Sequence, residues 1–135
     1  MDVRPARILL VDDEPDNLEV LEVVLAWEGF LVSKAGSGNE ALAMVAKRSP
    51  DLILLDLMMP RMTGYEVLAK LKAERATSDI PVMMVSAIMD PNAKGKALAA
   101  GAADFLAKPI DRDDLVRRVR NLLRKSFPGY RESEK

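Results

Sequence analysis

Residues 51–60 read DLILLDLMMP, in which a run of four apolar residues ends at an aspartate, Asp56. The apolar run 52–55 is too short for a helix and is continuous rather than alternating, which is typical of a parallel strand buried on both faces. Two further runs of this kind, ILLV and VMMV, occupy 8–11 and 82–85. Together the three runs predict a parallel sheet at the centre of the molecule.

The rest of the chain alternates between strand and helix patterns. Weaker strand candidates lie at 30–35 and 104–107, and leucines, alanines and charged residues recur at helical spacing between the strands. Short loops and right-handed crossovers then predict an α/β fold with a doubly wound, five-stranded parallel sheet flanked by five helices. We expect these helices over residues 15–28, 38–48, 63–74, 91–100 and 112–125.

Two helix ends carry recognisable signals. Ser37 and Glu40 stand at the spacing of a capping box, in which each side chain accepts a hydrogen bond from a free backbone N–H group. Gly29 suits the end of the first helix. Trp27, close to that end, is expected to be a packing residue.

The size and charge of the chain limit its function. With 135 residues and 49% hydrophobic residues the chain is large enough for one compact domain. We assign this domain to residues 1–125, and residues 126–135 to a tail or the start of a linker. A formal net charge of -1 gives no reason to expect direct nucleic-acid or membrane binding, and favours protein or small-molecule partners. The N-terminal stretch matches neither a signal peptide nor a membrane span, so we expect a cytoplasmic protein.

Polar residues follow four of the predicted strands. They are Asp12 and Asp13, Asp56, Ser86 and Lys108. Each one alone is more often a turn or cap residue than a reactive group. In an open parallel sheet, however, ligands bind outside the carboxyl ends of the strands, and the coincidence on four strands favours a site there.

The residue types at this edge indicate a particular chemistry. Three carboxylates repel one another unless a cation neutralises them, and an all-oxygen cluster suits Mg²⁺. Lys108 and Ser86 add a positive charge and a hydroxyl donor for phosphoryl oxygens. The chain lacks a P-loop, cysteine and histidine, so the best candidate nucleophile is Asp56, since a carboxylate is already ionised at neutral pH. Glu14 either extends the acid cluster or caps the first helix.

The motifs ILLVDDEPDN, DLILLDLMMPRMTG, VMMVSA and GAADFLAKP, in this order and at these intervals, resemble the receiver domain of two-component response regulators, of the CheY-like type. The resemblance covers about residues 6–125. It implies the strand order 2-1-3-4-5 and a signalling domain that is not an enzyme acting on external substrates.

The resemblance also implies roles for single residues. Asp56 would accept a phosphoryl group from the phosphohistidine of a sensor histidine kinase or of a phosphotransfer protein. Asp13, Asp56 and the backbone carbonyl of Met58 would bind Mg²⁺ directly and Asp12 through a water, with Mn²⁺ as an expected substitute. Lys108 would pair with a phosphoryl oxygen.

A further set of residues would convert phosphorylation into a changed surface. Ser86 would hydrogen-bond the phosphoryl group, the small Ala87 would leave the site open, and Phe105 would rotate in response. A cis peptide is implied between Lys108 and Pro109. The surface of the fourth helix, fifth strand and fifth helix would then meet an effector that the sequence does not identify, or a second copy of the chain.

Two positions are expected to tune the lifetime of the phosphoryl group. Met58 and Ile88 are bulky and apolar, and the resemblance places them along the route of the hydrolytic water. We therefore expect slow dephosphorylation.

Two alternatives stay open at this stage. The chain could be the receiver module of a longer regulator with a DNA-binding or nucleotide-cyclase output. It could also be a phosphatase similar to the haloacid dehalogenases, although Met58 stands where that family carries its acid/base aspartate.

Overall fold

The structure, a computed structural model, describes residues 4–87, 90–127 and 130. In this part of the chain five strands alternate with five helices, and none of the helices is both long and apolar enough to cross a membrane. The elements in chain order are β1 Arg7–Val11, α1 Pro15–Trp27, β2 Leu31–Ala35, α2 Gly38–Lys47, β3 Leu52–Asp56, α3 Gly64–Ala73, β4 Val82–Ser86, α4 Ala93–Ala99, β5 Asp104–Ala107 and α5 Arg112–Ser126.

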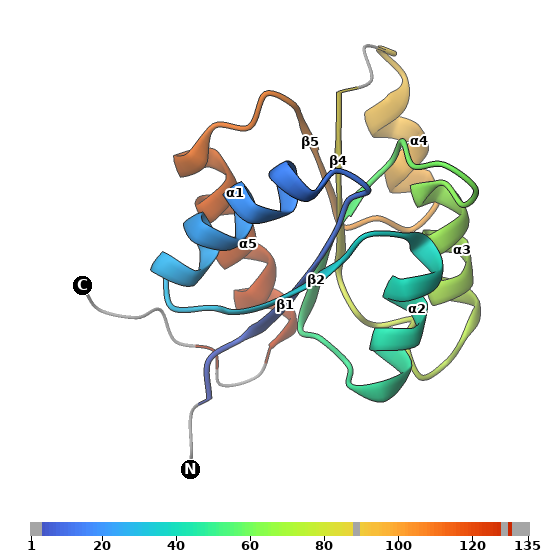
Figure 1. Cartoon of the computed structure of the whole chain (residues 1–135). Helices are drawn as coiled ribbons and strands as arrows, with labels where there is room; N and C mark the ends of the chain where they lie inside the picture. The colour runs from blue at the N-terminus through green and yellow to red at the C-terminus, as the bar shows by residue number, and fades with distance from the viewer. Residues whose placement is uncertain (1–3, 88–89, 128–129, 131–135) are drawn as a thin grey trace.

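All neighbouring strands are parallel and follow the order β2-β1-β3-β4-β5. Helices α1 and α5 cover one face of the sheet, and α2, α3 and α4 cover the other (Figure 1). The predicted doubly wound fold and the strand order implied by the resemblance are both confirmed.

The sheet has an apolar layer on each face. Both β3 and β4 are buried along their whole length, as the continuous apolar runs predicted. On one face Leu18, Leu21 and Leu25 of α1 lie at helical spacing and pack toward the sheet. Burying a leucine side chain stabilises a fold by about 1.5–3 kcal/mol, so these layers dominate its stability.

The helix ends agree in part with the signals in the sequence. Gly29 has a φ of 96°, the left-handed conformation that glycine tolerates best. Ser37 Oγ accepts a hydrogen bond from the N–H of Glu40, but the Glu40 carboxylate bonds the N–H of Gly36 rather than that of Ser37. The complete capping box lies instead at Thr63 and Glu66, at the start of α3.

Two expectations about the helices were wrong. Trp27 is 75% exposed, because its side chain lies off the α1 stripe that faces the sheet. Helix α4 begins at Ala93 rather than at residue 91. The reason is a turn at Asp90. The Asp90 side chain accepts a hydrogen bond from the N–H of Asn92, and the Asp90 carbonyl oxygen accepts one from the N–H of Ala93.

The two ends of the described chain meet at the edge where the strands begin. Arg4 binds Asp51 with both terminal nitrogens, at 2.7 and 2.9 Å. Its guanidinium group also lies 4.8 Å from the ring centroid of Phe127, which follows α5. An ion pair and a cation–π contact thus fasten the first residues to the end of the last helix.

Candidate functional site

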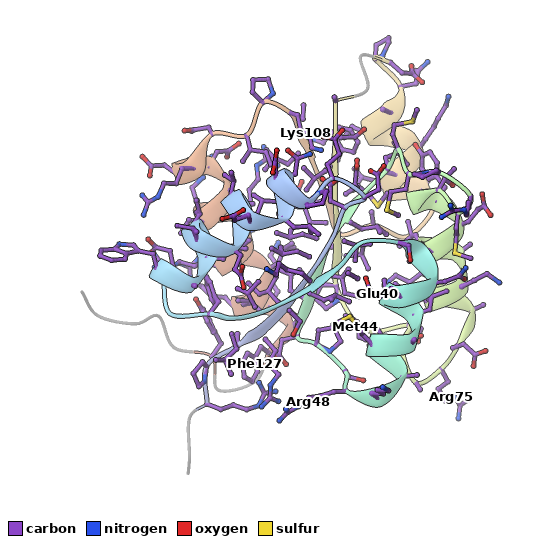
Figure 2. The ribbon with its side chains drawn as sticks, viewed as in Figure 1. Glu40, Met44, Arg48, Arg75, Lys108 and Phe127 are labelled. Atoms are coloured by element: carbon purple, nitrogen blue, oxygen red, sulfur yellow. The ribbon has the colours of Figure 1, made fainter. Side chains whose placement is uncertain are left out.

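The parallel sheet brings the polar strand ends together at its carboxyl edge. Asp12 and Asp13 follow β1, Asp56 is the last residue of β3, and Lys108 follows β5. Figure 2 shows Lys108 in the upper part of the molecule. Because β3 and β5 stand on either side of β4, and β1 lies next to β3, these four residues converge.

The distances in this cluster are short. Carboxylate oxygens of Asp12, Asp13 and Asp56 all lie within 4.8 Å of one another. Lys108 Nζ lies 3.1 Å from Asp12 Oδ2 and 3.8 Å from Asp56 Oδ2. With three carboxylates and one ammonium group, the cluster carries a formal charge of -2 when all four are ionised.

Asp12 is buried and held from two sides. Its Oδ1 accepts a hydrogen bond from the N–H of Glu14 at 2.9 Å, and its Oδ2 accepts one from Asn17 Nδ2 at 3.2 Å. Both donors belong to the start of α1, so the helix fixes the position of this carboxylate. Glu14 contributes its backbone as the N-cap residue, and its own carboxylate makes no capping bond.

Asp56 has an unusual environment for a carboxylate. It is 7% exposed, and its Oδ1 accepts one weak hydrogen bond from the N–H of Met58 at 3.3 Å. Burial, followed by repulsion from Asp12, raises the pKa of Asp56 to about 6, although Lys108 and the Met58 N–H act in the opposite direction. The carboxylate is therefore mostly ionised at neutral pH, and its charge is only partly compensated by Lys108.

The acidic cluster fits a hard divalent cation. Its donors are all oxygens, without nitrogen or sulfur, which suits Mg²⁺ or Mn²⁺ better than softer metals. Oxygens that share one octahedral Mg²⁺ lie roughly 3 to 4 Å apart, so the observed separation needs only a small contraction. Net negative charge and a buried, poorly compensated Asp56 favour such an ion.

Gly64 lies directly behind Asp56. Its N–H donates to the carbonyl oxygen of Leu57 at 2.9 Å. A Cβ atom at this position would meet the carbonyl oxygen of Asp56 and would lie 2.8 Å from Leu57 Cα. Only a residue without a side chain allows α3 to begin this close to the end of β3.

The residues expected to bind and respond to a phosphoryl group lie on β4 and β5. Ser86 is fully buried, and its carbonyl oxygen accepts a hydrogen bond from the Lys108 N–H at 2.8 Å. Phe105 is also buried, on the face that carries α4, and stands beside Met84 in the β4–β5 register. Ala87 is exposed, and the peptide bond between Lys108 and Pro109 is cis.

The two positions expected to control water access are Met58 and Ile88. The Met58 side chain is 62% exposed at the rim of the cluster. Ile88 lies outside the described residues.

Sequence reasoning missed two residues of this site. Asn17 lies in the motif ILLVDDEPDN, but no sequence pattern indicates that its side chain donates a hydrogen bond to Asp12, five positions earlier. Gly64 could have been found, since a glycine that follows a capping threonine in place of a good helix former indicates a close backbone approach.

Comparison with known proteins agrees with this geometry. Residues 8–120 match the response regulator receiver domain family. The chain is 48% identical over 119 residues to response regulator PleD of Caulobacter vibrioides, covering 88% of this chain and 26% of PleD. It is 42% identical over 126 residues to the DNA-binding response regulator MtrA of Mycolicibacterium smegmatis, covering 93% of this chain and 54% of MtrA.

A solved structure shows the same fold. The crystal structure of a putative response regulator from Chloroflexus aurantiacus matches with a TM-score of 0.86 and 38% identity, covering 90% of this chain and 99% of that one. By contrast, this chain spans between a quarter and about half of the length of PleD and MtrA. The family match leaves the phosphatase alternative without support. The chain belongs to the response regulator receiver domain family, and it is a signalling phosphoacceptor module of two-component systems.

Proposed function

We propose that Asp56 is the residue that accepts the phosphoryl group. The observation that carries this proposal is the position of its carboxylate, which is buried at the end of the central strand β3, within reach of two other carboxylates and 3.8 Å from Lys108 Nζ. The raised pKa leaves Asp56 ionised above a pH of about 6, which is the form that attacks phosphorus.

The donor is a phosphohistidine of a sensor histidine kinase or of a phosphotransfer protein, since receiver domains partner with histidine kinases. An Asp56 carboxylate oxygen forms a bond to phosphorus while the P–N bond breaks. The histidine nitrogen keeps the electron pair and takes up a proton, and Asp56 becomes an acyl phosphate. Lys108 compensates the charge on the transferred oxygens.

Asp13, Asp56 and the Met58 carbonyl would hold Mg²⁺ or Mn²⁺, with Asp12 acting through a water. When bound, the ion supplies positive charge at the oxygens of the transferred group. Asn17 and the Glu14 N–H hold the Asp12 carboxylate in place, and Lys108 lies between Asp12 and Asp56.

Phosphorylation would change the surface formed by α4, β5 and α5. The new charge draws the Ser86 hydroxyl toward the phosphoryl group, and the small Ala87 leaves room for it. The movement of Ser86 alters the packing of Phe105 and so of α4. A downstream effector or a second copy of the chain would bind the altered surface.

The exposed, bulky Met58, together with Ile88, would slow the entry of the hydrolytic water. A Met58→Asn, Ile88→Glu double variant should then lose phosphate faster than the parent, and an equal or slower rate would contradict this role.

A second possibility concerns the size of the natural protein. The chain spans only part of PleD and of MtrA, which favours a receiver module within a longer regulator. Residues 1–125 would form the receiver, and residues 126–135 a tail or the start of the linker to a DNA-binding or cyclase domain.

The test is incubation with acetyl phosphate and Mg²⁺, followed by intact mass spectrometry and size-exclusion chromatography. The parent and the control Asp79→Asn, an exposed aspartate away from the cluster, should each gain one phosphoryl group. Asp56→Asn should gain none. A phosphoryl group that persists on Asp56→Asn would refute the assignment of the acceptor.

A further inference from the structure

A cavity lies far from the acidic cluster, on the face of the sheet that α2 covers. It has a volume of about 220 Å³ and lies between β1, β2 and the end of α2. In Figure 2, Met44 and Arg48 of this region lie well below Lys108 and therefore away from the carboxyl edge. None of its lining residues belongs to the acidic cluster.

The cavity lies between the two strands and the last turns of α2, whose Met44 and Lys47 line it. Leu9 of β1 stands opposite Ser33 of β2, and both face the side on which α2 packs. Ala35, nearer the start of α2, is fully buried, whereas Ser33 is exposed. The small side chain of Ser33 leaves a hollow whose floor is Leu9, with Met44 and Pro50 as its apolar walls.

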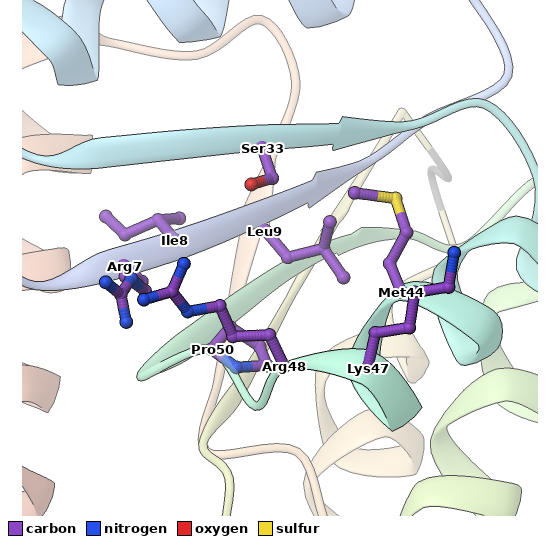
Figure 3. Close-up of a pocket in the computed structure, with 8 residues that line it drawn as sticks. All are labelled: Arg7, Ile8, Leu9, Ser33, Met44, Lys47, Arg48 and Pro50. Carbon is purple, nitrogen blue, oxygen red and sulfur yellow. The ribbon is translucent and has the colours of Figure 1, made fainter.

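Three cations surround this apolar floor. Figure 3 shows the guanidinium groups of Arg7 and Arg48 on the same side of the pocket and Lys47 toward its other end, with Leu9 and Met44 between them. In residues 4–87, 90–127 and 130, no carboxylate oxygen lies within 4.0 Å of a charged nitrogen of these three residues.

The surrounding charges do not neutralise the three cations. Asp51, the acid that most affects Arg7, already binds Arg4 through both carboxylate oxygens. The pKa of Arg7 lies below its usual value, first because of partial desolvation and then because of repulsion by Arg48 and Arg4. Lys47 and Arg48 have a structural explanation, since they are the last-turn and C-cap residues of α2 and complement the helix dipole, but Arg7 has no such explanation.

We propose that this pocket binds a small amphiphilic anion, in which a carboxylate or phosphate group meets Arg7 and Arg48 and an apolar body lies on Leu9, Met44 and Pro50. A guanidinium pair recognises such anions with paired hydrogen bonds. The volume is smaller than the roughly 300–1,000 Å³ of pockets for drug-sized ligands, so the ligand is short. This site is independent of the phosphoryl chemistry at Asp56.

The test uses the full, isotope-labelled chain and follows its backbone amide signals by NMR while octanoate is added. The amides of Ser33, Met44 and Lys47 should shift and saturate. Octylammonium, which has the same body and the opposite charge, should not produce these shifts. Acetate and inorganic phosphate, which have the charge without the body, should bind at least roughly tenfold more weakly.

Variants separate the role of charge from that of shape. Arg48→Gln should raise the Kd for octanoate by roughly tenfold or more, because a hydrogen bond between charged groups is lost. The matched control Arg75→Gln changes an exposed arginine outside the pocket and should leave the Kd unchanged (Figure 2). Ser33→Leu keeps every charge but fills the hollow, and it should abolish binding.

Each opposite result would overturn the proposal. If octylammonium binds as tightly as octanoate, the arginines do not recognise the ligand. If phosphate alone binds as tightly as octanoate, the apolar floor does not contribute to binding. Unchanged affinity in Ser33→Leu would place the ligand elsewhere. Vesicles of phosphatidylglycerol that sediment the chain, without saturable shifts from octanoate, would identify a membrane surface instead of a small ligand. Amide dispersion of each variant shows that it is folded.

Discussion

The charge on Asp56 works against the stability of the fold that presents it. Its usual pKa of 3.8 applies in the unfolded chain, whereas burial raises it to about 6 in the folded chain. Between these values the folded state binds more protons than the unfolded state, so stability falls as the pH rises. The raised pKa lowers the free energy of unfolding by about 3 kcal/mol, and the full loss is reached only above pH 6.

Asp56→Asn should therefore stabilise the metal-free protein at pH 7.5, by about 1–3 kcal/mol, and have little effect near pH 3.5. Urea unfolding in EDTA at several pH values measures this difference. The gain should appear between about pH 4 and 6. If the free energy of unfolding changes with pH in the same way for the parent and the variant, burial does not raise the pKa of Asp56. Asp79→Asn serves as the exposed control.

At the scale of elements, the junction between β3 and α3 depends on Gly64. The helix begins so close to the strand that a side chain would displace the backbone at Asp56 and Leu57. The same junction positions the proposed acceptor, so local packing and phosphoryl transfer are coupled there.

Gly64→Ala should lower the free energy of unfolding by about 1–3 kcal/mol and slow the phosphorylation of Asp56. Gly95→Ala is a matched control, because nothing lies within 4 Å of a Cβ added at this α4 position. It should be neutral or stabilising by up to about 1 kcal/mol. Chemical unfolding and acetyl phosphate labelling measure both effects. Equal behaviour of the two variants would contradict the close approach.

An ion pair between helices gives a second prediction. Glu28, at the end of α1, has a side chain that is 3% exposed and contacts Arg112 and Arg120 of α5. Glu28→Ala removes the carboxylate from between two arginines and should cost about 2–4 kcal/mol. Asp113→Ala removes an 89% exposed partner of Arg112 and should cost less than about 0.5 kcal/mol. Thermal unfolding that ranks the two variants equally would contradict the role of Glu28.

The elements that the sequence predicts well are those fixed by local pattern. The apolar runs of β1, β3 and β4 lie where the sequence places them, and so do the aspartates at the ends of β1 and β3 and the serine at the end of β4. Trp27 was misplaced because Val20 and Val23 lie on the same exposed side of α1, so apolar residues occur on both sides of the helix and hide the leucine stripe that faces the sheet. The partners of Glu28 lie 84 and 92 residues away in sequence, so no local pattern indicates them.

At the scale of the whole molecule, a cation held by the acidic cluster would couple metal binding to folding. The unfolded chain does not hold the three aspartates together, so an ion that binds them favours the folded state. The gain depends on how far the concentration of free metal exceeds its Kd.

Millimolar Mg²⁺ should raise the Tm of the parent by a few degrees, since a stabilisation of about 1 kcal/mol shifts Tm by roughly 2–8 °C in domains of this size range. Asp13→Asn removes one of the proposed ligands and should abolish most of the increase. Asp79→Asn should keep it. Calorimetry with and without EDTA measures these shifts, and an equal increase in Asp13→Asn would place the ion elsewhere.

The contact of Arg4 with Asp51 and Phe127 has a topological consequence. Arg4 and Phe127 lie side by side, so the chain could be joined there and opened elsewhere without moving its helices and strands. A circular permutant in which a short linker joins the regions of Arg4 and Phe127, opened in the turn between α3 and β4, should adopt the same fold. Its new termini would move to another loop, while the sheet and its acidic edge stay intact.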